Sequence, residues 1–314
     1  MKPTGGTGRN DGRFRRSLSL ASSPEGGPKL IGIYPNLDKP QALQQTVELA
    51  AWLTRHGYDW VVSPEVASAM GAPDRGAPVE SWTPGVNLVL VLGGDGTLLN
   101  AARRLRGSVP LLGVNLGHLG FLTELELPEL YDELPGFLQG HCQVDARLMI
   151  EASVVRSGDA AAHLIALNEF VIAKGPFARL MRLEVRVNQN YVDTYHADGL
   201  IVATPTGSTA YSLSAGGPLV SPGLDALVIT PICPHTLYSR SMVVAPEETI
   251  TVCLPGAQPG TVLTADGQSG FHLAEGDRIS VQLISERVRL LRRPGWSFYE
   301  VLRRKLRENS QPET

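Results

Sequence analysis

A glycine-rich turn that carries one carboxylate is the pattern with the clearest chemical potential in this chain. The apolar run 89–92 leads into Gly93-Gly94-Asp95-Gly96-Thr97, and a helical pattern follows. Glycines let a backbone approach a phosphate closely, and N–H groups at a helix start favour anions. An aspartate there would repel a phosphate unless it holds Mg²⁺ or takes a proton from an attacking hydroxyl. The alternative is a turn in which Asp95 only caps the helix.

A second glycine-bearing loop follows the next apolar run along the chain. Asn115-Leu116-Gly117-His118-Leu119-Gly120-Phe121-Leu122 comes directly after the run 110–114. The carboxyl ends of neighbouring parallel strands lie at one edge of a sheet, where α/β proteins bind ligands. The two loops therefore predict a shared site. His118 is a candidate phosphate contact there, and a solvent-exposed loop histidine is the alternative.

Two further segments combine polar groups that suit a nucleotide. Asn168 and Glu169 end an apolar run, and together they offer donors and acceptors for a ribose diol or an adenine edge. The segment 196–218 places Asp198, several hydroxyls and Tyr211 among small residues, with glycines that leave room for a ligand. An ordinary loop pair and a Thr/Ser-rich strand edge are the respective alternatives.

The surrounding hydrophobic patterns predict two kinds of architecture. We expect strands at 29–34, 60–62, 88–92 and 110–115, helices at 40–57, 98–105 and 127–139, and a long connection at 63–86. This alternation is typical of a doubly wound, mostly parallel α/β sheet. From about 144 onward, short runs with period-2 alternation, clearest at 183–187, predict an antiparallel all-β domain with turns at 197–199 and 265–267. The run 279–284 and the run from 288 are expected as two strands, and residues 297–308 as a basic amphipathic helix.

Composition excludes several classes of protein. The chain has 314 residues, a net charge of −3, and 43% hydrophobic and 19% charged residues, which argues against a general nucleic-acid binder. No apolar run approaches the ~20 residues of a membrane helix. The three cysteines suit neither a disulfide framework nor a zinc site, so a reducing, cytoplasmic location is expected. Residues 1–28, rich in Gly, Ser, Pro and Arg, are predicted to be a disordered leader.

Taken in order, these motifs resemble those of bacterial NAD kinases, which make NADP from NAD. The resemblance rests on the two glycine loops, Asn168-Glu169, the segment 198–218 and the segment 234–237, and covers about residues 29–303. The first loop alone also occurs in diacylglycerol-, sphingosine- and phosphofructokinase-like enzymes, whereas 198–218 is far more restrictive. The resemblance implies a phosphofructokinase/diacylglycerol-kinase-like nucleotide-binding domain at 29–143 and a β-rich NAD-binding domain at 144–291. The segment 292–314 is expected to pack back on the first domain.

The resemblance also implies roles for individual residues. Asp95 would be the general base on the 2′-hydroxyl of the adenosine ribose, and Gly96 would contact ligand through its backbone. Asn168 and Glu169 would bind ribose and base groups, and Asp198 the nicotinamide end or a neighbouring subunit's ligand. The adenine and nicotinamide pockets would be lined by Thr209, Ala210, Tyr211, Ser212, Leu213 and Ser214, and further substrate contacts would come from Arg179, His196 and Gln268.

The implied reaction needs ATP and NAD as substrates and Mg²⁺ or another divalent metal, which would arrive with the nucleotide because no residue is a convincing dedicated metal ligand. Inorganic polyphosphate as a donor, NADH as an acceptor and feedback by NADP(H) remain open. A homodimer or homotetramer is implied, without a nucleic-acid or membrane partner. The alternatives are a lipid or sugar-phosphate kinase of the same superfamily and a non-catalytic NAD(P)-binding sensor.

Overall fold

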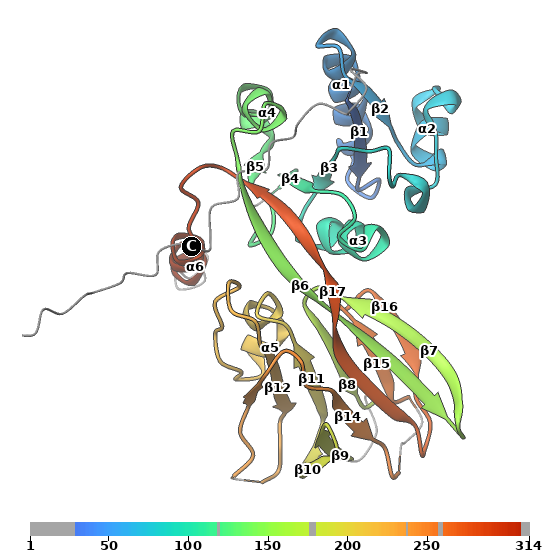
Figure 1. The fold of residues 1–314 in the computed structure, drawn as a ribbon, viewed down its shortest axis with the longest axis vertical. Coiled ribbons are helices and arrows are strands. Elements are labelled where there is room, and N and C mark those ends of the chain that lie inside the picture. The colour runs from blue at the N-terminus through green and yellow to red at the C-terminus, as the bar shows by residue number, and fades with distance from the viewer. Residues whose placement is uncertain (1–28, 118–119, 176–179, 237, 257–259, 309–314) are drawn as a thin grey trace, which may run out of the picture.

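The computed structural model describes residues 29–308 except 118–119, 176–179, 237 and 257–259. The predicted leader, His118 and Arg179 lie outside the described residues. Figure 1 shows an α/β part built from the first half of the chain and a β-rich part built mainly from the second. Over the described ranges, no helix is long and apolar enough to cross a membrane.

The α/β part is a parallel sheet with helices packed on it. Its strands lie in the order β4, β3, β1, β2, and the short β5 also pairs with β4 in parallel. Residues of β3 and β4 are all buried, which explains their uninterrupted apolar sequences. The strands are β1 (Leu30–Pro35), β2 (Asp59–Val61), β3 (Leu88–Gly93), β4 (Leu111–Asn115) and β5 (Leu125–Glu126). The helices are α1 (Ala42–Arg55), α2 (Pro64–Met70), α3 (Asp95–Leu105) and α4 (Leu130–Leu138), with 3-10 turns at Pro73–Arg75, Val79–Ser81 and Leu127–Glu129.

Two local expectations for this part were incomplete. The connection 63–86 contains α2, which begins after the N-cap Ser63 with Pro64 in its first turn and ends at Gly71 in the left-handed conformation. Helix α3 begins at Asp95 rather than at residue 98, because Gly94 is extended and serves as its N-cap. Asp95 is therefore the first residue of α3.

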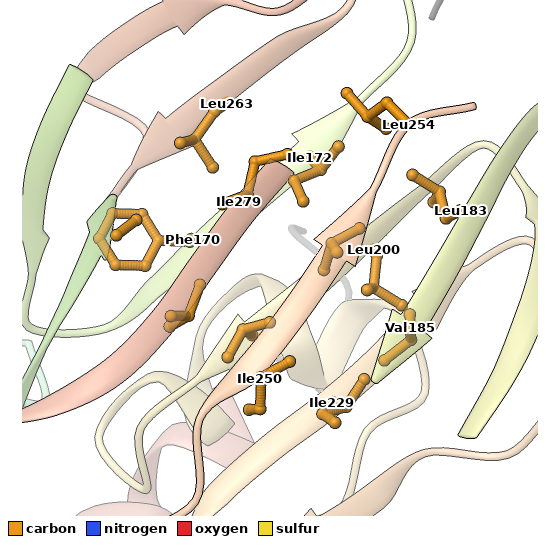
Figure 2. Packing of buried hydrophobic residues seen from close by; sticks show 14 of the residues in the cluster. Phe170, Ile172, Leu183, Val185, Leu200, Ile229, Ile250, Leu254, Leu263 and Ile279 are labelled. Carbon is orange, nitrogen blue, oxygen red and sulfur yellow. The ribbon is translucent and has the colours of Figure 1, made fainter. Parts of the chain in front are cut away.

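The β-rich part consists of two packed sheets, as the antiparallel prediction requires. One is a six-stranded sheet in the order β13-β12-β11-β8-β15-β16, and the other belongs to an eleven-stranded sheet that also contains the parallel strands of the α/β part. Figure 2 shows side chains of both sheets meeting in one core, among them Phe170, Leu183, Leu200 and Ile250. Alternate residues of β9 are buried, which is the period-2 pattern seen in its sequence.

The strands of this part are β6 (Gln143–Arg156), β7 (Asp159–Ala166), β8 (Glu169–Ala173), β9 (Met181–Val187), β10 (Asn190–Ala197), β11 (Gly199–Ala203), β12 (Leu227–Ile232), β13 (Met242–Val244), β14 (Ile250–Cys253), β15 (Val262–Ala265), β16 (Ser269–His272) and β17 (Arg278–Arg292). The expected turn at 265–267 joins β15 to β16, and Asp266 and Gly267 have φ of 50° and 65°. At the expected turn 197–199 the chain bends at Asp198, but no hairpin forms there, because β10 and β11 lie in different sheets.

Two long strands connect the α/β part to the β-rich part. The expected pair of strands after 279 is one strand, β17, which pairs with β6 along its length despite a register shift between Leu283 and Arg287. Near its end β17 also pairs with β4 in parallel, at Leu290 and Leu111. Figure 1 shows β6 and β17 running side by side from one part into the other. The chain then forms the expected basic helix, α6 (Phe298–Glu308). The domain boundaries given above stay a prediction.

Candidate active site

The carboxylate of Asp95 is bound by three consecutive backbone N–H groups of the second glycine loop. Its Oδ2 accepts from Phe121 N at 2.8 Å, and its Oδ1 accepts from Leu122 N at 3.1 Å and from Thr123 N at 3.2 Å. A carboxylate has about four acceptor positions, so one position, on Oδ2, remains for another donor. These bonds leave the helix and cross to another loop, so Asp95 is not an ordinary helix cap.

Two glycines make this arrangement possible. A Cβ on Gly120 would overlap the carboxylate of Asp95, and a Cβ on Gly93 would overlap the side chain of Thr97. The strand ends, β3 and β4, are neighbours in the sheet, as the shared-site prediction assumed. The close approach of the two loops therefore depends on glycine at both positions.

Arg292, at the end of β17, donates hydrogen bonds to the backbone carbonyl groups of the same loop. Its guanidinium is fully buried and donates to the carbonyl oxygens of Phe121, Leu122 and Thr123 at 3.0–3.3 Å. It also forms ion pairs with Glu124 at 3.2 Å and with Asp145 at 3.1 Å. The three residues whose N–H groups bind Asp95 thus have their carbonyl groups bound by Arg292.

Arg147, on β6, connects this cluster to the Thr/Ser-rich segment. It forms two hydrogen bonds with Asp145, at 2.7 and 2.5 Å, and donates to Thr206 Oγ1 at 3.2 Å. Burial alone would raise the pKa of Asp145, but Arg147 and Arg292 hold that pKa below its ordinary value. Asp95 lies within electrostatic range of Arg147, whose pKa burial lowers.

Asn168 and Glu169 contact the turn that begins with Thr204. Thr204 donates from N to Asn168 O at 2.8 Å and from Oγ1 to Leu167 O at 2.6 Å. A Cβ on Gly207 would overlap Asn168 O and come within 2.8 Å of Glu169 Oε2. Asn168 Oδ1 and Glu169 Oε2 are buried and have no hydrogen-bond partner among the described residues. Such atoms are rare in folded proteins and are suited to bind the donors of a ligand.

The Glu169 carboxyl is held largely in its neutral form. Its pKa is raised from 4.5 to about 8, first by burial and then by the negative charge of Asp266. At neutral pH the group can therefore donate as well as accept a hydrogen bond.

Gln268 and Gly96 meet at the edge of a hollow of about 660 Å³. Gln268 Nε2 donates to Gly96 O at 2.7 Å. The hollow is also lined by Gly94, Thr97 and Lys39. The Nζ of Lys39 lies 3.8 Å from the position that a Cβ on Gly117 would occupy, so this side chain reaches from the loop after β1 toward the loop after β4.

The segment 209–214 has mixed accessibility. Residues Gly207–Thr209 form a 3-10 turn, and Tyr211–Ser214 form the short helix α5. Tyr211 and Ser214 are exposed, and Thr209, Ala210 and Leu213 are half-buried. The Ser212 hydroxyl is fully buried and hydrogen-bonded to Thr230 Oγ1 at 2.9 Å, so this hydroxyl serves the protein interior.

Two expected site residues lie away from this group. Asp198 precedes β11 and Thr204 follows it, so the two are separated by the length of the strand, roughly 20 Å at 3.3 Å per residue. Asp198 is bound instead to Lys174 Nζ at 2.6 Å. His196, on β10, is exposed near the same end.

Several charged residues at the site were missed by sequence reasoning. They are Arg103, Glu124, Asp145, Arg147, Asp266 and Arg292. The available signal was a charged residue inside or beside an apolar strand, such as Arg147 before Leu148-Met149-Ile150 and Arg292 after Leu290-Leu291. That pattern indicates a buried charge but does not identify its partner.

Comparison with known proteins places these features in a family. A family model described as the ATP-NAD kinase N-terminal domain matches residues 31–142, and one described as the ATP-NAD kinase C-terminal domain matches residues 167–292. The chain belongs to the NAD kinase family. It is therefore a member of a phosphotransferase family, and the expected family membership and two-domain fold are confirmed.

Proteins named NAD kinase match this chain over most of its length. The NAD kinase of Moorella thermoacetica is 48% identical over 281 residues, 88% of this chain and 89% of that protein. The NAD kinase of Symbiobacterium thermophilum is 48% identical over 273 residues, 86% of this chain and 96% of that protein. These relatives argue against the alternative of a lipid or sugar-phosphate kinase.

Solved structures of the family share the fold. A yeast NADH kinase in complex with NADH has a TM-score of 0.82 at 25% identity, covering 92% of this chain and 90% of the yeast chain. An NAD kinase from Archaeoglobus fulgidus in complex with ATP has a TM-score of 0.68 at 23% identity, covering 89% of this chain and 98% of that one, and bears on the fold alone.

The raised pKa of Glu169 predicts a pH-dependent stability. Between its ordinary value of 4.5 and about 8, the folded protein holds a proton that the unfolded chain has released. The free energy of unfolding therefore falls as the pH rises through this range, by roughly 1.4 kcal/mol per unit of pKa shift. Glu169→Gln removes the titration, so urea unfolding from pH 5 to 8.5 should show a flatter loss of stability than in the unmodified protein. Glu286→Gln, at an exposed carboxyl with a lowered pKa, is the control and should follow the unmodified protein.

Proposed function

We propose that the protein transfers the γ-phosphoryl group of ATP to the 2′-hydroxyl of the adenosine ribose of NAD, giving NADP and ADP, with Asp95 as the general base. One observation carries the assignment of the base. Asp95 is fixed by three N–H groups and keeps one acceptor position on Oδ2 at the glycine loop. The relatives of this protein that are named NAD kinase support the choice of NAD and ATP as substrates.

The proposed reaction is an in-line displacement at phosphorus. The ribose oxygen forms a bond to the γ-phosphorus, the bond from that phosphorus to the β–γ bridging oxygen breaks, and ADP leaves. The hydroxyl proton passes to Oδ2 of Asp95. Because phosphoryl transfer needs little covalent chemistry from the protein, most of the rate comes from positioning and from neutralised charge.

The proposed donor site is the hollow beside Gly94 and Gly96. The first turn of α3 presents N–H groups there, and Lys39 adds a positive charge. Arg104 also lines the hollow, but it is paired with Glu80 at 2.8 Å. The described residues gather no group of three or more His, Cys, Asp or Glu, so we propose that a divalent metal enters as part of the magnesium–ATP substrate.

The proposed acceptor site joins Asn168 and Glu169 to the segment 209–214. The unpartnered Asn168 Oδ1 and Glu169 Oε2 suit the hydroxyls of a ribose or the edge of a base. Tyr211 is exposed enough to pack on a ring. A cytoplasmic location fits this use of ATP and NAD and is proposed with it.

We also propose that the active unit is a homodimer or homotetramer in which Asp198 serves a neighbouring subunit's ligand. The support is its position at the far end of β11 from Thr204. Exposed Tyr191 and Tyr238, at 56% and 93%, provide apolar surface for such an assembly on the β-rich part.

Asp95→Asn should lower kcat for NADP formation by about 100-fold or more, because an amide accepts a proton far less readily than a carboxylate. NAD binding, measured by calorimetry, should survive, because the other proposed nucleotide contacts come from Asn168, Glu169 and the segment 209–214. Near-normal turnover in this variant would overturn the assignment of the base. Absence of NADP formation by the unmodified protein would favour the non-catalytic sensor.

Lys39→Met should raise KM for ATP by about 10-fold or more, because a charge-assisted bond to phosphate contributes ~1.5–3 kcal/mol. KM for NAD should change little. Lys29→Met, at the opposite end of β1, is the matched control with unchanged constants. A rise in KM for NAD alone in Lys39→Met would assign the hollow to the acceptor instead.

Mixing inactive subunits tests the role of Asp198. If Asp198 acts across subunits, Asp95→Asn and Asp198→Asn proteins that are each nearly inactive should regain activity when they are unfolded together and refolded. A mixture no more active than its components would place Asp198 on its own subunit's ligand. Sedimentation of the unmodified protein as a monomer would exclude the assembly itself.

A further inference from the structure

Asp266, in the turn between β15 and β16, carries a second carboxylate bound by three consecutive backbone N–H groups. Its Oδ1 accepts from Asn168 N at 2.8 Å and from Glu169 N at 3.2 Å, and its Oδ2 accepts from Leu167 N at 3.1 Å. Its own N donates to Glu169 O at 3.0 Å. One turn of the β-rich part therefore fixes the backbone of the segment that carries Asn168 and Glu169.

The same carboxylate is joined to the helix that begins with Asp95. Arg103, two turns along α3, donates from Nη1 to Asp266 Oδ2 at 2.8 Å. The Arg103 side chain is 10% exposed and that of Asp266 is fully buried, so this ion pair is shielded from water. Arg103 Nη2 also donates to Gln268 Oε1 at 2.6 Å, and Gln268 in turn binds Gly96 O.

These contacts form a closed connection between the two halves of the site. On one side, Asp266 binds the backbone at 167–169. On the other, Asp266 binds Arg103 in the last turn of α3, and Gln268 binds both Arg103 and the carbonyl group of Gly96, the second residue of the helix. All four acceptor positions of the Asp266 carboxylate are occupied, so it has none left for a substrate.

We propose that Asp266 is a positioning residue that, through Arg103 and Gln268, sets the placement of Asn168 and Glu169 relative to Asp95. The inference rests on the proposed function, in which Asp95 is the base and Asn168 and Glu169 hold the acceptor nucleotide. A misplacement of about 1 Å between base and hydroxyl is enough to cost roughly 100-fold in rate. The contacts of Asp266 and Arg103 therefore set the position of Asn168 and Glu169 relative to Asp95, rather than the position of either side alone.

Asp266 acts on Glu169 by charge as well as by geometry. It is the charged neighbour that raises the pKa of Glu169, after burial. On its other side Glu169 faces Gly207, where a Cβ would come within 2.8 Å of Oε2, and Arg103 is paired with Asp266. Removing the charge of Asp266 should therefore move the titration of Glu169 to lower pH, an effect that a purely structural role would not produce.

The chain offers a matched control for this carboxylate. Asp277, at the start of β17, is also fully buried in its side chain, paired with an arginine, Arg156 at 2.8 Å, and bound to a backbone N–H, that of Ala274 at 2.8 Å. It directly precedes Arg278, which pairs with Val155 at the end of β17 far from its pairing with β4 at Leu290. Asp277→Asn should therefore reproduce the structural cost of losing a buried aspartate that is paired with an arginine, without touching the site.

The test compares Asp266→Asn with Asp277→Asn by thermal unfolding, steady-state kinetics and pH dependence of kcat/KM for NAD. We expect both variants to lose thermal stability. We expect Asp266→Asn alone to lose at least 10-fold in kcat/KM for NAD per folded molecule, and to show its alkaline inflection at lower pH. Equal kinetic constants and inflections in the two variants would overturn the inference, leaving Asp266 as an ordinary buried residue.

Arg103 provides a second measurement if Asp266→Asn fails to fold. Arg103→Lys keeps the charge but cannot contact Asp266 and Gln268 together, because an ammonium lacks the planar fork of a guanidinium. It should lose kcat/KM for NAD by at least 5-fold while folding normally, and unchanged kinetics would contradict the connection. Failure of the proposed function is seen separately, as absence of NADP formation by the unmodified protein, and failure of the base assignment as normal turnover in Asp95→Asn.

Discussion

The bonding of the Asp95 carboxylate to the backbone at 121–123 is the interaction on which the site depends. It joins the loop after β3 to the loop after β4 and requires glycine at position 120, where any Cβ would overlap the carboxylate. A loop can present three N–H groups on one side only if its carbonyl groups are satisfied on the other, since buried backbone groups are nearly always paired. Arg292 supplies that pairing from inside the protein.

The buried charges behind this loop are better explained by geometry than by stability. Ion pairs inside proteins gain little net stability, because removing the charges from water costs several kcal/mol per ion. Arg292, Arg147, Asp145 and Glu124 nevertheless form one cluster, and Arg292 and Arg147 come from β17 and β6. These two strands run from the β-rich part into the sheet of the α/β part. The β-rich part therefore contributes the groups that hold the loop bound to Asp95 in place.

Local sequence patterns were sufficient for most elements and for the motifs of the site. The buried strands β3 and β4, the alternation of β9 and the glycine loops are all encoded within a few residues. What failed depends on distant contacts. Residues 197–199 resemble a turn, but β10 and β11 pair with different partners. Asp145 and Arg147 sit near an apolar run, yet their contact with Arg292 and Thr206 arises only when β6, β17 and β11 are assembled.

Asp95 and Asp266 differ in their hydrogen bonding in a way that distinguishes the proposed base from a positioning residue. Both aspartates accept three consecutive backbone N–H groups, so local bonding alone does not distinguish them. Arg103 fills the fourth acceptor position of Asp266, whereas no residue in the described part of the chain donates a hydrogen bond to the fourth position of Asp95. A base must receive a proton at a lone pair that is not already bonded, and the acceptor position on Asp95 Oδ2 meets that requirement. The number of occupied acceptor positions, rather than the Asp-Gly sequence that both residues share, therefore supports the proposed role of Asp95.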